Sequence, residues 1–397
     1  MAVTDFKQDY ILRYEDILSK VMVGLKIANT RFQPNMKFGD TVVRTILNLS
    51  GVRVRAFTNL NDQTIDPITD AEETMTINVQ SGCVFPIARL EEIQAGPLNP
   101  AMVAGKEVAI KVANYLDAQI LAETKNAWAT FDTGNLTTAA ANGTPITLSS
   151  TTVPQMVAQS YAKLFSNNVA MTNLCWVLDP FSVSQIAQFP IGKDITSENT
   201  VFKNGFTGNL FGAEVYTSNN LTGEATLVAA DVFIDTQTVV INGITFTSVN
   251  PIGATAGNFL LGANKEASLA NLAGLINAPG TTSATQVALS AANQILITDV
   301  YGLSASVTDA TLTLTGKGAS RMTLSETETN VAWSTNFVYA YYGMKGAIDV
   351  AIQDQPKVEM REEARQLTTN IFNNVVAAIK TFTDGAQKFL AVKIANA

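Results

Sequence analysis

The chain has 397 residues, of which 47% are hydrophobic and only 15% charged, and its formal net charge is −8. It has no histidine and two cysteines, which excludes Ser-His-Asp and Cys-His nucleophiles, imidazole metal sites and a zinc site built from cysteine alone. Roughly 25% of residues are charged in an average soluble protein, so a chain this poor in charge is expected to bury much of its surface against other molecules.

The N-terminal end is basic, whereas the remainder of the chain is acidic. Asp5, Asp9, Glu15, Asp16 and Asp40 are outnumbered there by Lys7, Arg13, Lys20, Lys26, Arg31, Lys37, Arg44, Arg53 and Arg55. Apolar residues recur at three-to-four spacing over residues 5–28, which predicts an amphipathic helix. An arm that touches an acidic partner, either nucleic acid or protein, and a solvated basic helix both fit this pattern.

No targeting segment is expected. The early acids interrupt any apolar core in the first 20 residues, so a signal peptide is not predicted. No window of about 18 uncharged apolar residues occurs either, so no transmembrane helix is predicted. Cys83 and Cys175 lie in the apolar stretches "SGCVFPI" and "NLCWVLD" and are expected to be buried free thiols. We therefore expect a soluble protein made in a reducing cytoplasm.

Residues 38–87 alternate polar and apolar side chains in "TVVRTIL", "VRVRAFT" and "TMTINVQ", which predicts a long, exposed β-hairpin or loop with little core of its own. The clearest helix follows over about 100–126. Asn99 is placed to cap it and Pro100 suits its first turn. Val108, Val112, Leu116 and Ile120 then form a stripe at four-residue spacing. Such a helix would be about 40 Å long, which indicates a structural strut.

Residues 132–153 are small and polar and predict a loop, after which Pro154 opens a helix. "NLCWVLDP" predicts a buried strand followed by a helix from Asp179-Pro180. The next segment, "VFKNGFTGNLFGAEVYTSNNL", spaces Gly205, Gly208 and Gly212 closely. Such spacing occurs in loops that cradle phosphates and equally in turns that lead into a strand.

The phosphate interpretation fails on the residues that follow these glycines. A P-loop needs lysine and then serine or threonine after its last glycine, but Gly212 precedes Ala213 and Glu214. A dinucleotide fingerprint needs a helix at that point, whereas "AEVYTSNNL" alternates as a strand does. The segment is therefore predicted to be turns plus a strand, without chemistry.

Residues 231–330 are rich in threonine, alanine and glycine and predict a compact α+β unit of ordinary domain size. Asn242-Gly243 predicts a hairpin turn. "SLANLAGLINAPG" predicts a helix capped by Ser268, while "QVALSAANQILITDV" and "ATLTLTG" predict strands. After this unit, residues 367–380 fit a helix or a strand, and we favour the strand. Asp384-Gly385 predicts a turn before a final strand.

Candidate catalytic residues are confined to three carboxylate pairs, Glu72-Glu73, Glu91-Glu92 and Glu362-Glu363. Adjacent carboxylates on surface turns usually serve solvation, and none of these lies in a stretch that predicts a buried cleft. The calcium-loop pattern is absent, although an incidental site for a hard cation stays open. We predict no catalytic, cofactor-binding or metal-binding residues, and hence no enzyme.

The order of these elements resembles the major capsid proteins of tailed bacteriophages with the HK97 fold, particularly the P22-like coat proteins. Two segments carry the resemblance: the long helix that ends in "NYLDAQIL", which is similar to the family's spine helix, and the glycine turns that lead into "GAEVYTSNNL", which are similar to a segment of its axial domain. The resemblance covers nearly all of residues 1–230 and 331–397.

The resemblance implies an α+β HK97-like capsid fold with an inserted small α+β domain. It places an N-terminal arm at 1–36, an extended loop at 37–85, a peripheral domain with the spine helix at 86–150, an axial domain at 151–230, an insertion domain at 231–330, an axial return at 331–344 and peripheral strands at 345–397. It also implies self-assembly through hexamers and pentamers into an icosahedral shell around double-stranded DNA, in a virion assembled in the host cytoplasm.

The implied partners are further copies of the chain, a scaffolding protein, a portal, packaged double-stranded DNA bound non-specifically on the inner face, and a decoration protein, with no membrane. Some family members crosslink through a lysine on the extended loop, but residues 51–75 contain none. Two other hypotheses stay open. One is a phage tail tube or sheath protein, and the other is a hydrolase or carbohydrate-binding module that uses carboxylates of the inserted unit.

Overall fold

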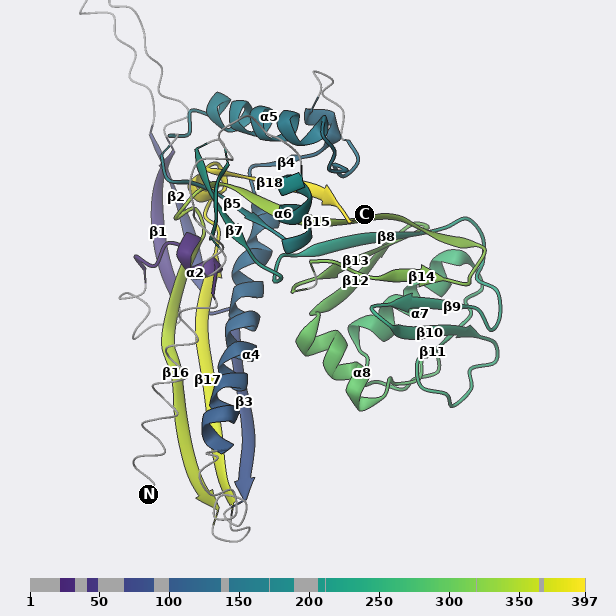
Figure 1. The fold of residues 1–397 in the computed structure, drawn as a ribbon. Helices are drawn as coiled ribbons and strands as arrows, with labels where there is room; N and C mark the ends of the chain where they lie inside the picture. Colours follow the sequence, from purple (N-terminus) through teal and green to yellow (C-terminus); the bar gives the residue numbers. More distant parts are fainter. Residues whose placement is uncertain are drawn as a thin grey trace, which may run out of the picture.

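The computed structural model describes residues 22–32, 41–48, 68–88, 100–136, 143–170, 172–188, 206–210, 212–318, 320–363 and 368–396. Helices and strands are mixed along the chain, which confirms the α+β class. An elongated unit of long strands and one long helix stands beside a compact second unit (Figure 1). The predicted domain boundaries stay predictions.

The elongated unit is built on helix α4 (Pro100–Ala122) and the short 3-10 helix η2 (Glu123–Asn126) that continues it. The predicted helix over 100–126 is confirmed, and at 1.5 Å per residue α4 alone is about 35 Å long. Its predicted stripe faces the core, since Val112, Leu116 and Ile120 are buried and Val108 is partly buried against them. The cap predicted at Asn99 lies outside the described residues.

Alongside α4 runs a three-stranded antiparallel sheet of long strands (Figure 1). Its order is β16 (Asp349–Glu363), β17 (Thr368–Lys380) and β3 (Val79–Ala88). The strand favoured for residues 367–380 is thereby confirmed. The strands pair over most of their length, and α4 lies along this sheet and contacts β3.

Strands β1 (Thr41–Asn48) and β2 (Thr69–Thr76) pair antiparallel, as the predicted hairpin requires. Residues 49–67 between them lie outside the described residues. One face of this ribbon is buried through Val42 and Met75, while Val43 on the opposite face is 55% exposed. The hairpin thus has a docked face and a free face.

Of the helix predicted over 5–28, residues 5–21 lie outside the described part, and the rest contains one turn, α2 (Gly24–Ile27). This turn packs on α4, and the chain after it reaches the start of β16 through a parallel bridge between Asn29 and Asp349.

A nine-stranded sheet joins the two units. The predicted buried strand is β5, in which every side chain is buried, and Trp176 stacks on Tyr342 of the neighbouring strand with ring centroids 4.2 Å apart. Helices α5 (Thr152–Ser166) and α6 (Pro180–Gln188) follow the two predicted helix starts. The strands are β4 (Ala129–Phe131), β5 (Leu174–Leu178), β6 (Phe206–Leu210), β7 (Ala213–Thr217), β8 (Gly223–Ala229), β12 (Leu303–Thr308), β13 (Thr311–Gly316), β15 (Val331–Met344) and β18 (Phe389–Ala395).

The second unit adds a four-stranded sheet in the order β11 (Asn258–Leu260), β10 (Ile244–Val249), β9 (Thr238–Ile241), β14 (Leu324–Glu326). Helix α7 (Lys265–Asn277) packs its leucines into a core separate from that of the elongated unit. The predicted turn at Asn242-Gly243 is confirmed, because both residues have positive φ, 49° and 80°, as a type I′ hairpin requires.

Two predictions for this unit were wrong. "QVALSAANQILITDV" contains α8 (Ala291–Ile295) and the π-helical turn η5 (Leu296–Val300) where strands were expected. Ser290 begins this helix, since its Oγ accepts a hydrogen bond from the backbone N of Asn293 at 3.4 Å. Helix α7 is capped by Asn264 and not by Ser268, which lies inside the helix and accepts instead from the backbone N of Gly262.

Candidate functional site: a polar junction below the hairpin

The candidates named from the sequence do not form a site. Gly212 lies in the turn between β6 and β7 with φ +78°, so the predicted turn before a strand is confirmed, while Gly208 lies within β6 at a register shift. Glu72 is exposed on β2, and Glu91 and Glu92 lie outside the described residues. Within the described ranges no three His, Cys, Asp or Glu side chains gather to hold a metal ion.

Both cysteines are free thiols, as predicted. Cys175 is buried on β5, and burial raises the pKa of its thiol to about 12. Cys83 on β3 is only half-buried, and burial raises the pKa of its thiol as well. A raised pKa keeps a thiol protonated at neutral pH and therefore a poor nucleophile.

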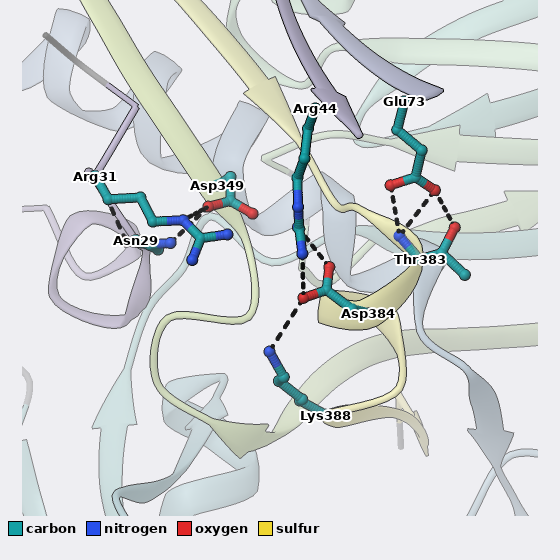
Figure 2. Close-up of polar contacts among 8 residues, drawn as sticks. All are labelled: Asn29, Arg31, Arg44, Glu73, Asp349, Thr383, Asp384 and Lys388. Atoms are coloured by element: carbon teal, nitrogen blue, oxygen red, sulfur yellow. Dashed lines mark hydrogen bonds and ion pairs between the residues drawn. The ribbon is translucent and has the colours of Figure 1, made fainter. Parts of the chain in front are cut away.

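Polar and charged side chains concentrate instead where the hairpin and residues 22–32 meet the long sheet (Figure 2). The short helix α9 (Thr383–Ala386), which follows β17 at the predicted turn, lies at the centre. We call this cluster the polar junction; it consists of Asn29, Arg31, Arg44, Glu73, Asp349, Thr383, Asp384 and Lys388.

Phe382, which is completely buried, is the apolar centre of the junction. It packs with Val42 and Met75 of the hairpin and with Ala351 and Ala378 of the long sheet. The ring of Phe32 meets it edge-on, with centroids 5.7 Å apart. Hairpin, N-terminal segment and sheet therefore share one aromatic side chain.

Two side chains of the hairpin bind α9. They are Arg44 and Glu73, which lie opposite each other in the β1–β2 register. The Arg44 guanidinium binds both carboxylate oxygens of Asp384, at 2.6 and 2.8 Å, and lies 5.2 Å from the centroid of Phe382. Glu73 accepts hydrogen bonds from the backbone N and the Oγ1 of Thr383. A carboxylate that receives the free N–H groups of a helix start acts as its cap, so the hairpin caps α9 from outside.

Arg44 and Asp384 form a tight ion pair, and each shifts the pKa of the other. The hydrogen bonds from Arg44 lower the pKa of Asp384 to about 2, helped by the nearby Lys388. The same hydrogen bonds raise the pKa of Arg44 above its usual value. A planar guanidinium that binds a carboxylate through two donors fixes orientation as well as distance.

Asp349 fastens residues 22–32 to the edge of β16. Asn29 Nδ2 donates to Asp349 Oδ1 at 2.6 Å. The backbone N of Asn29 donates to the Ile348 carbonyl at 2.8 Å, and the backbone N of Val350 donates to the Asn29 carbonyl at 2.9 Å. Burial raises the pKa of Asp349 to about 6, against the opposing effect of Arg31.

Asp117 on α4 holds the other end of the same segment. Its Oδ1 accepts from the backbone N of Gly24 at 2.5 Å, and its Oδ2 accepts from Ser218 Oγ at 2.8 Å and Asn220 Nδ2 at 3.1 Å. Burial raises the pKa of this carboxyl. The segment is thus attached to the rest of the chain at two buried carboxylates.

A third buried carboxylate links the two units. Asp179, completely buried after β5, binds Arg321 Nε at 2.8 Å and accepts from the backbone N of Phe181 and Ser182. The Arg321 guanidinium also lies over the Phe181 ring, 4.4 Å from its centroid. Arg321 belongs to the second unit and Asp179 to the first, so this pair joins their cores.

The contacts of the junction anchor the hairpin and the N-terminal segment to the long sheet. Its carboxylates accept hydrogen bonds from arginine, lysine, asparagine, threonine or backbone donors. Of its members, the sequence analysis named Glu73 as one of a carboxylate pair expected to serve solvation, but it did not bring the eight residues together. Asn29 and Asp349 are separated by 320 positions, and Arg44 and Asp384 by 340, so only the fold brings them together.

Comparisons with known proteins give likenesses in structure alone. The chain is similar to a structure from Mycobacterium phage Che8 (11% identity, 93% of this chain and 90% of that chain covered, TM-score 0.49). It is also similar to the capsid of Cyanophage P-SCSP1u (11%, 93% and 86%, 0.48) and to the mature capsid of bacteriophage PhiM1 (9%, 90% and 83%, 0.47). At such identities the likeness concerns the course of the backbone and not particular side chains.

No family model matches the chain, and no curated protein matches it. Among the described residues, none of the helices combines the length and the apolar character needed to cross a bilayer.

Proposed function

We propose that this chain is a major capsid protein that self-assembles into a closed shell around the double-stranded DNA of a tailed phage, and that it is not an enzyme. The observation that carries the proposal is the elongated unit, in which a 23-residue helix lies along a sheet of strands up to 15 residues long. The resemblance to the family's spine helix implies this arrangement. At one end, the elongated unit contacts the hairpin and the N-terminal segment.

The free faces of this unit suit contact with further copies of the chain. Val43 and Ile68 on the hairpin and Val84 on β3 are each more than half exposed. Exposed apolar side chains on extended elements lose unfavourable water contact when a neighbouring subunit covers them. An assembled shell would give each copy such neighbours.

The finer features of the proposal follow from the resemblance. They are hexamers and pentamers, an icosahedral lattice, the domain limits given above, a scaffolding protein, a portal and assembly in the host cytoplasm. The basic N-terminal end would face DNA or an acidic scaffold, and binding to DNA there would be non-specific and weakened by salt. The second unit would brace neighbouring capsomers or receive a decoration protein.

The hydrolase or carbohydrate-binding hypothesis needs carboxylates that are free to act on a substrate. In the second unit several of them support the backbone instead. Glu328 is buried and accepts from the backbone N of Ile234 at 2.8 Å and of Asn330 at 3.2 Å. Asp235 accepts from the backbone N of Asn250. No observation in the fold favours a tail tube or sheath.

Electron microscopy of the purified full chain tests the proposal. We expect closed shells or capsomers, while open tubes would favour the tail protein. A chain that stays strictly monomeric in light scattering at assembly concentrations would refute both. Val43→Asp should prevent assembly while leaving the subunit folded by circular dichroism. The control Val228→Asp, at an exposed position of strand β8 away from the hairpin, should still assemble.

A further inference from the structure

Asp179, Asp384 and Asp349 differ in how well their charge is compensated. Asp179 has a guanidinium at 2.8 Å and further donors. Asp384, which is 37% exposed, has a guanidinium bound through two donors. Asp349 is 4% exposed, yet its closest cation, Arg31 Nε, lies 3.9 Å away on a side chain that is 54% exposed. Asp349 therefore carries a poorly compensated charge when it is ionised.

The other charged groups near Asp349 do not supply the missing compensation. Arg44 on β1 is bound to Asp384, and Asp384 itself repels a second negative charge. Lys380, the register partner of Asp349 on β17, directs its Nζ to the Thr74 carbonyl at 2.6 Å. Lys388 binds Asp384 at 3.5 Å. Arg31 and Asn29 favour the ionised form most, and Arg44 adds a smaller effect in the same direction.

The N-terminal segment is what covers this carboxylate. The backbone of Asn29 bonds to the residues on either side of Asp349, at the edge of β16 that faces away from β17. Figure 2 shows Asn29 and Arg31 over Asp349 from that side. If the segment leaves, Asp349 returns to water.

We propose that residues 27–32 dock on the edge of β16 with uptake of a proton by Asp349, so that this segment is held more tightly in mildly acidic than in neutral solution. The sign follows from linkage. The docked carboxyl has a pKa of about 6, above the ordinary value of about 3.9 that it regains in water. Docking therefore binds protons between these values and strengthens as the pH falls through 6.

Hydrogen exchange of the full chain, read by mass spectrometry on peptides that cover 28–32 and 346–352, tests the proposal. With the two pKa values above, the protection factor should be roughly tenfold higher at pH 5 than at pH 7.5, after correction for the intrinsic pH dependence of exchange. In the Asp349→Asn variant, the protection factor should no longer depend on pH in this way. The control Asp309→Asn, at an exposed turn, should keep this dependence.

Arg31→Gln gives a second readout that a purely structural role would not produce. Because Arg31 lowers the pKa of Asp349, its removal should move the midpoint of the change to higher pH. Asp117 also has a raised pKa and also contacts the N-terminal segment, but it does so at Gly24. Exchange in a peptide that covers 22–27 therefore reports on Asp117 separately from Asp349. The proposal would be overturned if protection in the wild-type chain were equal at pH 5 and pH 7.5, or if the difference persisted in Asp349→Asn.

Discussion

Loss of the cation that faces Asp179 should weaken the connection between the two units. Arg321→Met removes the guanidinium that lies over the Phe181 ring, and the buried carboxylate loses its only ion pair among the described residues. Breaking a buried pair from one side typically costs about 3–5 kcal/mol. The donors from Phe181 and Ser182 remain, so we expect the lower end, about 3 kcal/mol.

The reverse change is less harmful, and this asymmetry is the sharper test. In Asp179→Asn the arginine keeps partial access to water, since its side chain is 20% exposed, so we expect a loss of about 1–2 kcal/mol. The double variant should be more stable than the sum of the two losses implies, because it leaves no buried charge unpaired.

Urea unfolding of the unassembled chain measures these effects. Tryptophan fluorescence reports on both cores, through Trp176 in the first and Trp333 beside the second. The control Lys265→Met removes an exposed ammonium group that donates to the Ala230 carbonyl at 3.5 Å, and it should change the free energy of unfolding by less than about 0.5 kcal/mol. A loss below about 1 kcal/mol in Arg321→Met would refute the reasoning.

Two further predictions concern the Arg44–Asp384 pair and the glycine turn. The pKa of Asp384 is lowered to about 2, so its ionised form stabilises the folded chain above its ordinary pKa near 3.9, and this stabilisation is lost as the pH falls from about 4 to 2. Thermal unfolding of Asp384→Asn should show less pH dependence than wild type in that window, and equal slopes would contradict the prediction. Gly212→Ala should cost about 1 kcal/mol, because φ is +78° although the added Cβ meets no atom within 4 Å. Gly212→Asn should cost less in the same urea assay, and an equal or larger loss would point to a cause other than φ.

Local patterns were enough to predict the elements that carry their own signals. Helix α4 combines a proline at its first position with a stripe at four-residue spacing, and β5 is a short apolar run between polar residues. The hairpin at Asn242-Gly243 needs only two residues with positive φ. In each case the signal is local in the sequence, although the partners of β5, strands β7 and β15, lie further along the chain.

Helix α8 shows where alternation misleads. The apolar residues Val287, Leu289, Ile295 and Ile297 permit a strand pattern, but Ser290 caps a helix start directly after Leu289. A serine followed by two alanines was the available signal. At α7 the same preference for serine gave the wrong cap, because Asn264 stands four residues earlier and its side chain reaches the backbone N of Ala267 at 2.8 Å.

The polar junction could not be predicted, because none of its residues is unusual in its own neighbourhood. Asp349 begins a strand, Arg44 lies in an alternating one, and Asp384 follows a threonine in a turn. Their significance arises from burial and from partners more than 300 positions away. The missing histidines and the failed glycine motif could exclude enzyme classes, but they could not locate an anchoring site.

The arrangement at Phe382 has a consequence for how the two extended parts of the chain behave. Phe32 rests on one edge of this ring, and Arg44 holds the hairpin over it while binding Asp384. Since Phe382 is fully buried, moving either part opens the contacts on which the other part depends. Packed cores resist gradual deformation, so the hairpin and the N-terminal segment are expected to shift together. Protonation of Asp349 is then expected to affect the hairpin as well as the segment that Asp349 holds.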